Sequence, residues 1–138
     1  MSKSKGKIRC LMSKPGSDGH WRGIVVVSQG LRDAGMEIIF GGFQSPKQIV
    51  ETAIQEDVDI IGLSIHSGAH FLYTKQVIDL LNQKNANNQF MILVGGAISS
   101  TDFPKLREIG AANVYGPGTL VPDVVKFINN NLEKYINR

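Results

Sequence analysis

Short apolar runs alternate with segments of helical pattern along almost the whole chain of 138 residues. The runs, such as the one at 59–64, contain Ile, Leu and Gly in close succession, and each is followed by a longer segment with helical spacing of apolar residues. Continuous apolar runs of this length are typical of strands that are buried on both faces. The alternation therefore predicts five βα units, which fold into a parallel sheet covered by helices on both faces.

Apolar periodicity and turn residues set the boundaries of the expected elements. Strands are expected at 7–13, 37–41, 59–64, 90–95 and 113–115. Helices are expected at 21–34, 46–56, 69–83, 101–110 and 122–135. Because crossovers between parallel strands are right-handed, the natural arrangement is a doubly wound, flavodoxin-like (Rossmann-like) sheet of five parallel strands in the order 2-1-3-4-5. We expect a single domain over 1–138, in which 1–6 is a flexible basic leader.

The composition argues against several classes of protein. The net charge of +3 is small and spread along the chain, which argues against a nucleic-acid partner. No apolar run reaches the length of a membrane span, and no separate apolar signal segment follows the basic N-terminal residues. We therefore expect a cytoplasmic, soluble protein with neither nucleic acid nor membrane as a partner.

Some packing positions can be predicted as well. The single cysteine, Cys10, lies in the first apolar run, where we expect a core residue and not a reactive thiol. The helix over 69–83 is expected to carry its apolar residues on or near one face. They are Phe71, Leu72, Val77, Ile78, Leu80 and Leu81.

The segment 14–23 carries the residues of greatest chemical interest. It connects the first expected strand to the first expected helix, and it contains glycines, a proline, a lysine, an acid and a histidine. A connection of this kind opens at the carboxyl edge of a parallel sheet, where ligands bind. His20 is therefore expected within reach of a metal or a ligand.

Asp18 and His20 fit the chemistry of a metal-binding imidazole. A neutral imidazole gives one ring nitrogen to a metal, while its other nitrogen donates to an acceptor such as a carboxylate. Asp18 could be that acceptor, and Lys14 could hold the carboxylate in turn. From the spacing alone, a capping aspartate beside an exposed histidine is the simpler interpretation. A lone histidine is not a zinc site, so a metal on His20 would arrive inside a cofactor that supplies its other ligands.

Glycines follow the other strands that end at the same edge. Gly95 and Gly96 follow the fourth strand, and Gly116 and Gly118 follow the fifth. Each glycine alone is explained by a turn or a helix cap. Clustered on one edge they indicate a slot for a planar or elongated group, because glycine lets the backbone approach a ligand closely.

The sequence Asp18-Gly19-His20-Trp21-Arg22-Gly23 resembles the Asp-x-His-x-x-Gly signature of cobalamin-binding domains. The chain as a whole resembles the vitamin B12 domain of the methylmalonyl-CoA mutase family and the separate small subunits of related acyl-CoA mutases. The resemblance covers roughly residues 7–128. Further matches are Arg32–Gly35, Ile54–Asp59, Ser67–His70, Gly95–Gly96 and Gly116–Thr119.

The resemblance implies a bound adenosylcobalamin whose dimethylbenzimidazole is displaced from cobalt, with the nucleotide tail in a pocket between the sheet and the helices. His20 would be the lower cobalt ligand, Asp18 would accept a hydrogen bond from its other ring nitrogen, and Lys14 would complete the relay. Ser64 matches a serine that contacts the displaced base, and the glycines match residues that line the tail channel. The implied cofactor-binding residues are Asp18, Gly19, His20, Gly23, Ser64, His66, Gly68, Gly95, Gly96, Gly116, Gly118 and Thr119.

The chain departs from the family pattern at His66, where the Ser-x-Leu element of the family has leucine. We expect His66 to fill the space of the leucine, with one incidental hydrogen bond. His70, in a stretch that matches the mutases, is expected to be structural near the start of a helix. Trp21 and Arg22 occupy variable positions of the signature, where they would pack on the corrin or touch a partner, and neither is expected to be catalytic.

The resemblance also implies the reaction and the partner. In the mutase family an adenosyl radical removes a hydrogen from the substrate, and a 1,2-rearrangement follows inside a TIM barrel. A barrel of that kind needs about 250 residues. This chain would therefore be the small subunit of an isomerase, inactive without a large catalytic subunit. The candidate substrates are methylmalonyl-CoA, isobutyryl-CoA and 2-hydroxyisobutyryl-CoA.

Three alternatives are considered. A corrinoid shuttle for methyl transfer carries the same signature, but usually adds an N-terminal helical domain, and only 1–6 precede the first expected strand here. A phosphoacceptor receiver domain would need an aspartate at the end of the third strand and a lysine after the fifth, where Ser64 and Gly116 stand. A flavin-binding protein would need a hydroxyl-rich phosphate loop, which 14–19 is not.

Overall fold

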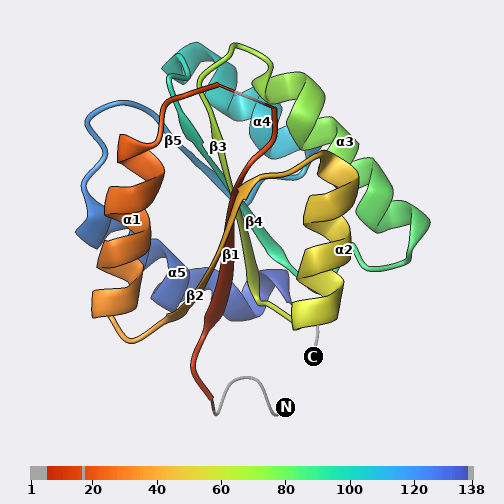
Figure 1. The fold of residues 1–138 in the computed structure, drawn as a ribbon, viewed down its shortest axis with the longest axis horizontal. Helices are drawn as coiled ribbons and strands as arrows, with labels where there is room; N and C mark the ends of the chain where they lie inside the picture. The colour runs from red at the N-terminus through yellow and green to blue at the C-terminus, as the bar shows by residue number, and fades with distance from the viewer. Residues whose placement is uncertain (1–5, 17, 137–138) are drawn as a thin grey trace.

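The computed structural model describes residues 6–16 and 18–136. All of the expected leader except Gly6 lies outside the described residues, as does Ser17. Five strands form one parallel sheet in the order β2-β1-β3-β4-β5, which confirms the prediction (Figure 1). Strands and helices alternate along the chain, so the sheet is wound from βα units as the apolar pattern indicates.

The strands are short, and the three central ones are almost completely buried. They span Arg9–Lys14 (β1), Glu37–Phe43 (β2), Ile60–Ile65 (β3), Met91–Gly96 (β4) and Asn113–Tyr115 (β5). All residues of β3 are buried, which explains its apolar composition, because helices cover both of its faces. The edge strand β2 mixes exposed and half-buried positions.

The helices begin and end at recognisable local signals. They span Arg22–Asp33 (α1), Pro46–Glu56 (α2), His70–Gln83 (α3), Phe103–Ile109 (α4) and Val121–Tyr135 (α5). Ser45 and Gln48 form reciprocal hydrogen bonds that cap α2, and Gly35 follows α1 with a φ of +94°. Over the described residues, every helix is too short or too polar to cross a bilayer.

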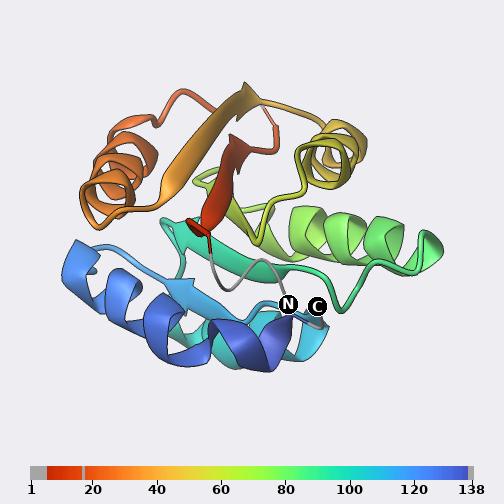
Figure 2. The same ribbon diagram turned by 90° about the horizontal axis from the view of Figure 1, so that it is seen from below.

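The helices divide between the two faces of the sheet. Figure 2 shows α1 and α5 on one side of the sheet, and α2 and α3 on the other. The core under α1 and α5 includes Cys10, Leu31 and Ile128, whereas the core on the opposite face includes Ile49 and Val77. Because β1, β3 and β4 lie between these two cores, packing on both faces fixes their positions, and the loops that follow them are well placed to form a site.

The predicted elements are confirmed, with boundaries that differ from those observed by at most two residues. The helix expected at 101–110 begins as a 3₁₀ turn, Ser100–Asp102, and becomes α-helical only at Phe103. Ser99 caps this turn by accepting a hydrogen bond from the backbone N–H of Thr101. The α-helix therefore begins two residues later than expected, after the capped 3₁₀ turn.

One packing prediction is confirmed and one is wrong. Cys10 is fully buried, and its burial, with the nearby charge of Asp59, raises the pKa of the thiol to about 12. Leu72, expected on or near the apolar face of α3, is 55% exposed. The buried positions of α3 include His70 and Thr74, and Leu72 lies two residues from each, which turns it to the opposite side of the helix.

Candidate cofactor-binding site

Loops after four neighbouring strands meet at one edge of the sheet, the upper edge in Figure 1. Parallel pairing brings the carboxyl ends of β1, β3, β4 and β5 to this edge. The loop after β1 holds Asp18 and His20, and the segment after β3 begins with His66. The predicted site residues from distant parts of the sequence therefore lie together.

Lys14, the last residue of β1, is fully buried. Its ammonium nitrogen lies 2.8 Å from Asp18 Oδ1, and 3.5 Å from both the carbonyl oxygen and the hydroxyl oxygen of Ser64. Removing an ammonium group from water is costly, so a buried lysine requires partners of this kind. Lys14 thus connects the loop after β1 to the end of β3.

The carboxylate of Asp18 accepts hydrogen bonds from two backbone N–H groups and forms an ion pair with Lys14. The backbone N–H of His20 donates to Oδ1 at 3.1 Å, and the backbone N–H of His66 donates to Oδ2 at 3.3 Å. Burial by itself would raise the pKa of Asp18, but the hydrogen bond from Lys14 and the two backbone N–H groups lower it to about 2. Asp18 is therefore ionised at neutral pH and can act only as an acceptor.

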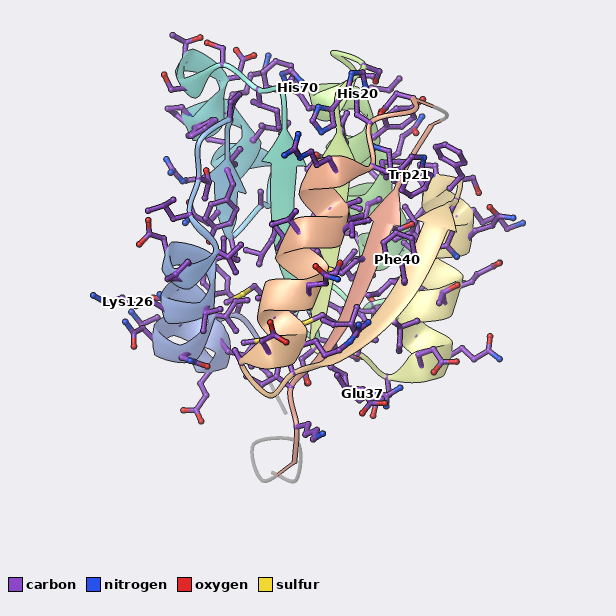
Figure 3. All side chains as sticks on the ribbon, turned by 60° about the vertical axis from the view of Figure 1, so that its left-hand side comes forward. His20, Trp21, Glu37, Phe40, His70 and Lys126 are labelled. Carbon is purple, nitrogen blue, oxygen red and sulfur yellow. The ribbon has the colours of Figure 1, made fainter. Side chains whose placement is uncertain are left out.

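The imidazole of His20 is 68% exposed and turns Nδ1 toward Asp18. The distance from Nδ1 to Asp18 Oδ1 is 3.5 Å, longer than a strong hydrogen bond. This orientation leaves Nε2 as the ring nitrogen that a metal can reach. Figure 3 shows His20 at the same end of the molecule as His70, and opposite to Glu37. Asp18 accepts the backbone N–H of His20 and also faces its ring, but it does not cap α1, whose N-cap residue is Trp21. The metal-binding interpretation stays a prediction.

The ring of His66 stacks on the ring of His20. The two ring centroids are 4.8 Å apart, and the ring planes differ by only 14°. Burial and the positive charge of Lys14 lower the pKa of His66, against the opposing effect of Asp18. His66 is therefore neutral at pH 7. The half-buried ring of His66 packs on the candidate metal ligand, and the hydrogen bond to Asp18 comes from the backbone N–H of His66. That His66 fills the space of the leucine stays a prediction.

The described residues contain no group of three His, Cys, Asp or Glu side chains placed to hold a metal ion. A single imidazole with one free nitrogen instead suits a metal that already carries its other ligands. The donor set around His20, with a carboxylate behind Nδ1, matches the arrangement that fixes the tautomer of a metal-bound histidine. The residues present therefore fit a histidine that binds a metal held inside a cofactor.

A cavity of about 270 Å³ lies between the sheet and the helices α1 and α5. Most of its lining is apolar, with Ile24, Val27 and Leu31 from α1 and Val124 from α5. Eight of the predicted cofactor-binding residues line it. They are Gly23, Ser64, His66, Gly95, Gly96, Gly116, Gly118 and Thr119. The cavity therefore brings together most of the residues that the resemblance assigned to cofactor binding.

Glycine is required on the cavity wall for more than one reason. Gly96 has a φ of +140°, and a Cβ there would collide with the carbonyl oxygen of Ile65. At Gly116 a Cβ would lie 3.1 Å from the carbonyl oxygen of Ile98, which is tighter than an ordinary contact. A Cβ on Gly23 would meet no described atom within 4 Å and would reduce the open space at the start of α1. Gly96 and Gly116 are therefore needed because of the backbone beside them, whereas Gly23 leaves open space that a side chain would fill.

The remaining predicted residues lie outside the cavity. Gly19 and Gly68 occupy exposed loops, and neither lines it. His70 is buried, as expected for a structural residue, with Nε2 2.9 Å from Asp102 Oδ2. Trp21 packs beside the aromatic rings of Phe40 and Phe43 on β2, not beside His20.

Sequence reasoning missed a row of residues that forms the floor of the cavity. Met12, Gly62 and Leu93 are register partners on β1, β3 and β4, and all three line the cavity. A Cβ on Gly62 would lie only 2.7 Å from the sulfur of Met12, so this glycine makes room for the methionine. The signal was a glycine inside an otherwise apolar strand, which indicates a close approach.

Comparisons with known proteins agree with this geometry. A sequence model described as the B12 binding domain matches residues 8–125. The 2-hydroxyisobutanoyl-CoA mutase small subunit of Aquincola tertiaricarbonis is 40% identical over 108 residues, covering 78% of this chain and 79% of that subunit. The mitochondrial methylmalonyl-CoA mutase of Homo sapiens is 31% identical over the whole chain. The chain spans only 18% of that enzyme.

A solved structure supports the same fold. A cobalamin-binding protein from Desulfitobacterium hafniense superposes with a TM-score of 0.77 at 19% identity, covering 90% of this chain and 58% of that one. At this identity the likeness shows the fold alone. The family match and the 40% identical small subunit together extend over most of the sequence. The chain therefore belongs to the family of B12-binding domains, and it is related to the members of that family found in the acyl-CoA mutases.

Proposed function

We propose that this chain is the cobalamin-binding small subunit of an adenosylcobalamin-dependent acyl-CoA mutase, and that His20 is the lower ligand of the cobalt. The observation that carries the proposal is the orientation of the His20 ring. It turns Nδ1 toward the carboxylate of Asp18 and stacks on His66, which lines the glycine-walled cavity. A ring nitrogen that could bind cobalt therefore lies beside a cavity that could hold a displaced base.

The buried pair of Lys14 and Asp18 would hold His20 in the correct state. The carboxylate is ionised and cannot donate, so it favours the tautomer of His20 that carries its proton on Nδ1. That tautomer leaves the lone pair of Nε2 for cobalt. Lys14 keeps the carboxylate in place at 2.8 Å and limits the negative charge that faces the imidazole.

The cavity would hold the nucleotide tail with its base displaced from cobalt. Its wall is apolar where α1 and α5 face the sheet, which suits a flat aromatic base. The hydroxyl of Ser64 and the backbone around Gly116 and Gly118 offer polar groups to the base and the phosphate. We assign Gly19 and Gly68, in the exposed loops beside His20, to the edge of the corrin.

When bound, adenosylcobalamin supplies a carbon-centred radical through homolysis of its cobalt–carbon bond, and this is chemistry that no side chain can supply. The residues of this chain hold His20 in one tautomer and enclose the tail. No residue of the chain is proposed to touch the substrate. The substrate would bind in a large partner subunit built on a TIM barrel, which faces the exposed side of the corrin.

The relatives favour one substrate class. The 40% identical relative is a separate small subunit of a mutase named for 2-hydroxyisobutanoyl-CoA, and this chain covers most of its length. We therefore propose 2-hydroxyisobutyryl-CoA, which differs from isobutyryl-CoA by a hydroxyl group, as substrate, ahead of methylmalonyl-CoA and isobutyryl-CoA. We also propose that the chain works as a single domain in the cytoplasm.

Titration of the purified chain with adenosylcobalamin, followed by ultraviolet and visible absorption, tests the binding step. The wild-type chain is expected to give the spectrum of a histidine-ligated, base-off form. We expect Asp18→Asn to weaken binding about 10- to 100-fold, the usual effect of removing the partner of a metal-bound histidine. Lys126→Ala, on the exposed side of α5, is the matched control and should bind like the wild type.

Assays of acyl-CoA rearrangement test whether catalysis requires the large subunit in addition to this chain. The loaded chain alone should not isomerise 2-hydroxyisobutyryl-CoA, and activity should appear when the large mutase subunit of the same source is added. Turnover by the chain alone would contradict the proposal. Methyl transfer from methylcobalamin, without any support of the mutase reaction, would also contradict it and would favour a corrinoid shuttle.

A further inference from the structure

The ring of His66 lies against the ring of His20, where it can restrict the orientation of that ring. His66 directly follows β3, and its backbone N–H donates to Asp18 Oδ2 at 3.3 Å. The same carboxylate accepts the backbone N–H of His20 through its other oxygen. One carboxylate therefore ties together the two loops that carry the two imidazoles.

Among the residues that the structure describes, little else restrains the orientation of the His20 ring. Its side chain is 68% exposed, and its contact with Asp18 through Nδ1 is long at 3.5 Å. The backbone hydrogen bond to Asp18 fixes the main chain of His20 and leaves the side-chain torsions free. The parallel ring of His66, at 4.8 Å between centroids and 14° between planes, is the flat surface against which the imidazole rests.

We infer that His66 is a positioning residue, whose ring stacks on His20 and holds its imidazole plane in the orientation that presents Nε2 to the cobalt. This inference rests on the proposed role of His20 as the lower ligand. It assigns a function to the aromatic face of His66 and none to its ring nitrogens. An aliphatic side chain of similar size would fill the same volume, but it would offer no flat surface to the imidazole.

Three variants separate the face of the ring from its nitrogens and its volume. His66→Phe keeps an aromatic face without ring nitrogens, His66→Leu keeps the volume, and His66→Asn keeps a polar group without a ring. Each would be loaded with cob(II)alamin, and its affinity would be measured by absorption. Electron paramagnetic resonance with ¹⁵N-histidine would report the axial nitrogen and, through its line widths, the spread of ring orientations. Thermal unfolding without cofactor would show that each variant folds.

We expect the wild type and His66→Phe to share narrow lines with a label-sensitive nitrogen splitting. His66→Leu and His66→Asn should bind cob(II)alamin about two- to tenfold more weakly, the range expected for one lost aromatic pair, with broadened splittings. If His66→Leu matches the wild type in affinity and line width, the inference is overturned while His20 keeps its role. The inference is also overturned if His66→Asn gives the wild-type spectrum and His66→Phe does not. If the wild-type splitting ignores the label, His20 is not the ligand, and the proposed function fails with the inference.

Discussion

At the scale of single residues, the buried ammonium of Lys14 keeps the carboxylate of Asp18 ionised. It is fully buried and has Asp18 as its acidic partner, at 2.8 Å. An exposed ion pair contributes little to stability, but a charge left inside the protein without its partner is strongly unfavourable. The pair is thus part of the fold as well as part of the proposed relay.

Replacing Asp18 by asparagine should therefore destabilise the protein even without cofactor. We expect Asp18→Asn to lower the free energy of unfolding by roughly 1–3 kcal/mol, because Lys14 loses its charged acceptor. Asp79→Asn, which breaks the exposed pair of Asp79 with Lys75, is the matched control and should change stability by less than about 0.5 kcal/mol. Urea unfolding at pH 7 measures both, and equal effects of the two substitutions would contradict the account.

The pH dependence of the same pair has a definite sign. The pKa of Asp18 is lowered from 3.8 to about 2 in the folded state, so the unfolded chain takes up the proton first as pH falls. The stability that Asp18 contributes is therefore complete above about pH 4, and it is lost between 3.8 and about 2. The difference in unfolding free energy between wild type and Asp18→Asn should shrink over that interval. A difference that grows on acidification would show that the sign is wrong.

At the scale of the elements, the carboxyl end of β4 forms part of the cavity wall. Gly95 and Gly96 are neighbours on this wall, but only Gly96 has a backbone that excludes other residues, with a φ of +140°. A Cβ on Gly95 would lie 3.6 Å from the carbonyl oxygen of Tyr115, which is an ordinary contact. The backbone therefore requires glycine at position 96, whereas position 95 has room for a Cβ.

Substitution of each glycine by alanine tests this difference. Gly96→Ala should destabilise the protein by roughly 1–3 kcal/mol or more, because it forces a strained φ and meets the backbone of Ile65. Gly95→Ala should stay within about 1 kcal/mol of the wild type. Chemical denaturation without cofactor provides the comparison. Equal stability of the two variants would mean that the backbone at Gly96 adapts easily.

The elements themselves were predictable, because their signals are local. The capping pattern of Ser45 and Pro46 marked the start of α2, and the uninterrupted apolar run marked β3. The helical spacing of apolar residues did not settle which side of α3 faces the sheet, and Leu72 was assigned wrongly for that reason. Side-chain burial on a helix depends on the neighbouring elements, which the local pattern does not contain.

At the scale of the whole molecule, the cavity occupies only one of the two layers. The cavity lies under α1 and α5, whereas the core beneath α2 and α3 is on the opposite face. Its floor depends on the register that aligns Met12, Gly62 and Leu93, and the stack of His20 on His66 depends on the closeness of two loops. Both come from the assembled sheet, so the sequence predicted the glycine-lined walls but not the floor or the stack.

This asymmetry predicts a one-sided response to cofactor. Binding of cobalamin in the cavity should slow amide hydrogen exchange in α1, whose residues Ile24, Val27 and Leu31 line it. Exchange in α2, on the opposite face, should change much less. Mass spectrometry of peptides from the two helices gives the comparison within one sample. Equal exchange in α1 with and without cobalamin would contradict the placement of the tail.

Electron paramagnetic resonance can decide whether His20 is the lower ligand of the cobalt, as proposed. The protein would be loaded with cob(II)alamin twice, once with ordinary histidine and once with ¹⁵N-histidine. We expect the nitrogen splitting to change from a triplet to a doublet with the label, and His20→Ala to abolish this change. If cobalamin binds and the splitting ignores the label, the base of the cofactor remains on cobalt and the assignment of His20 is wrong.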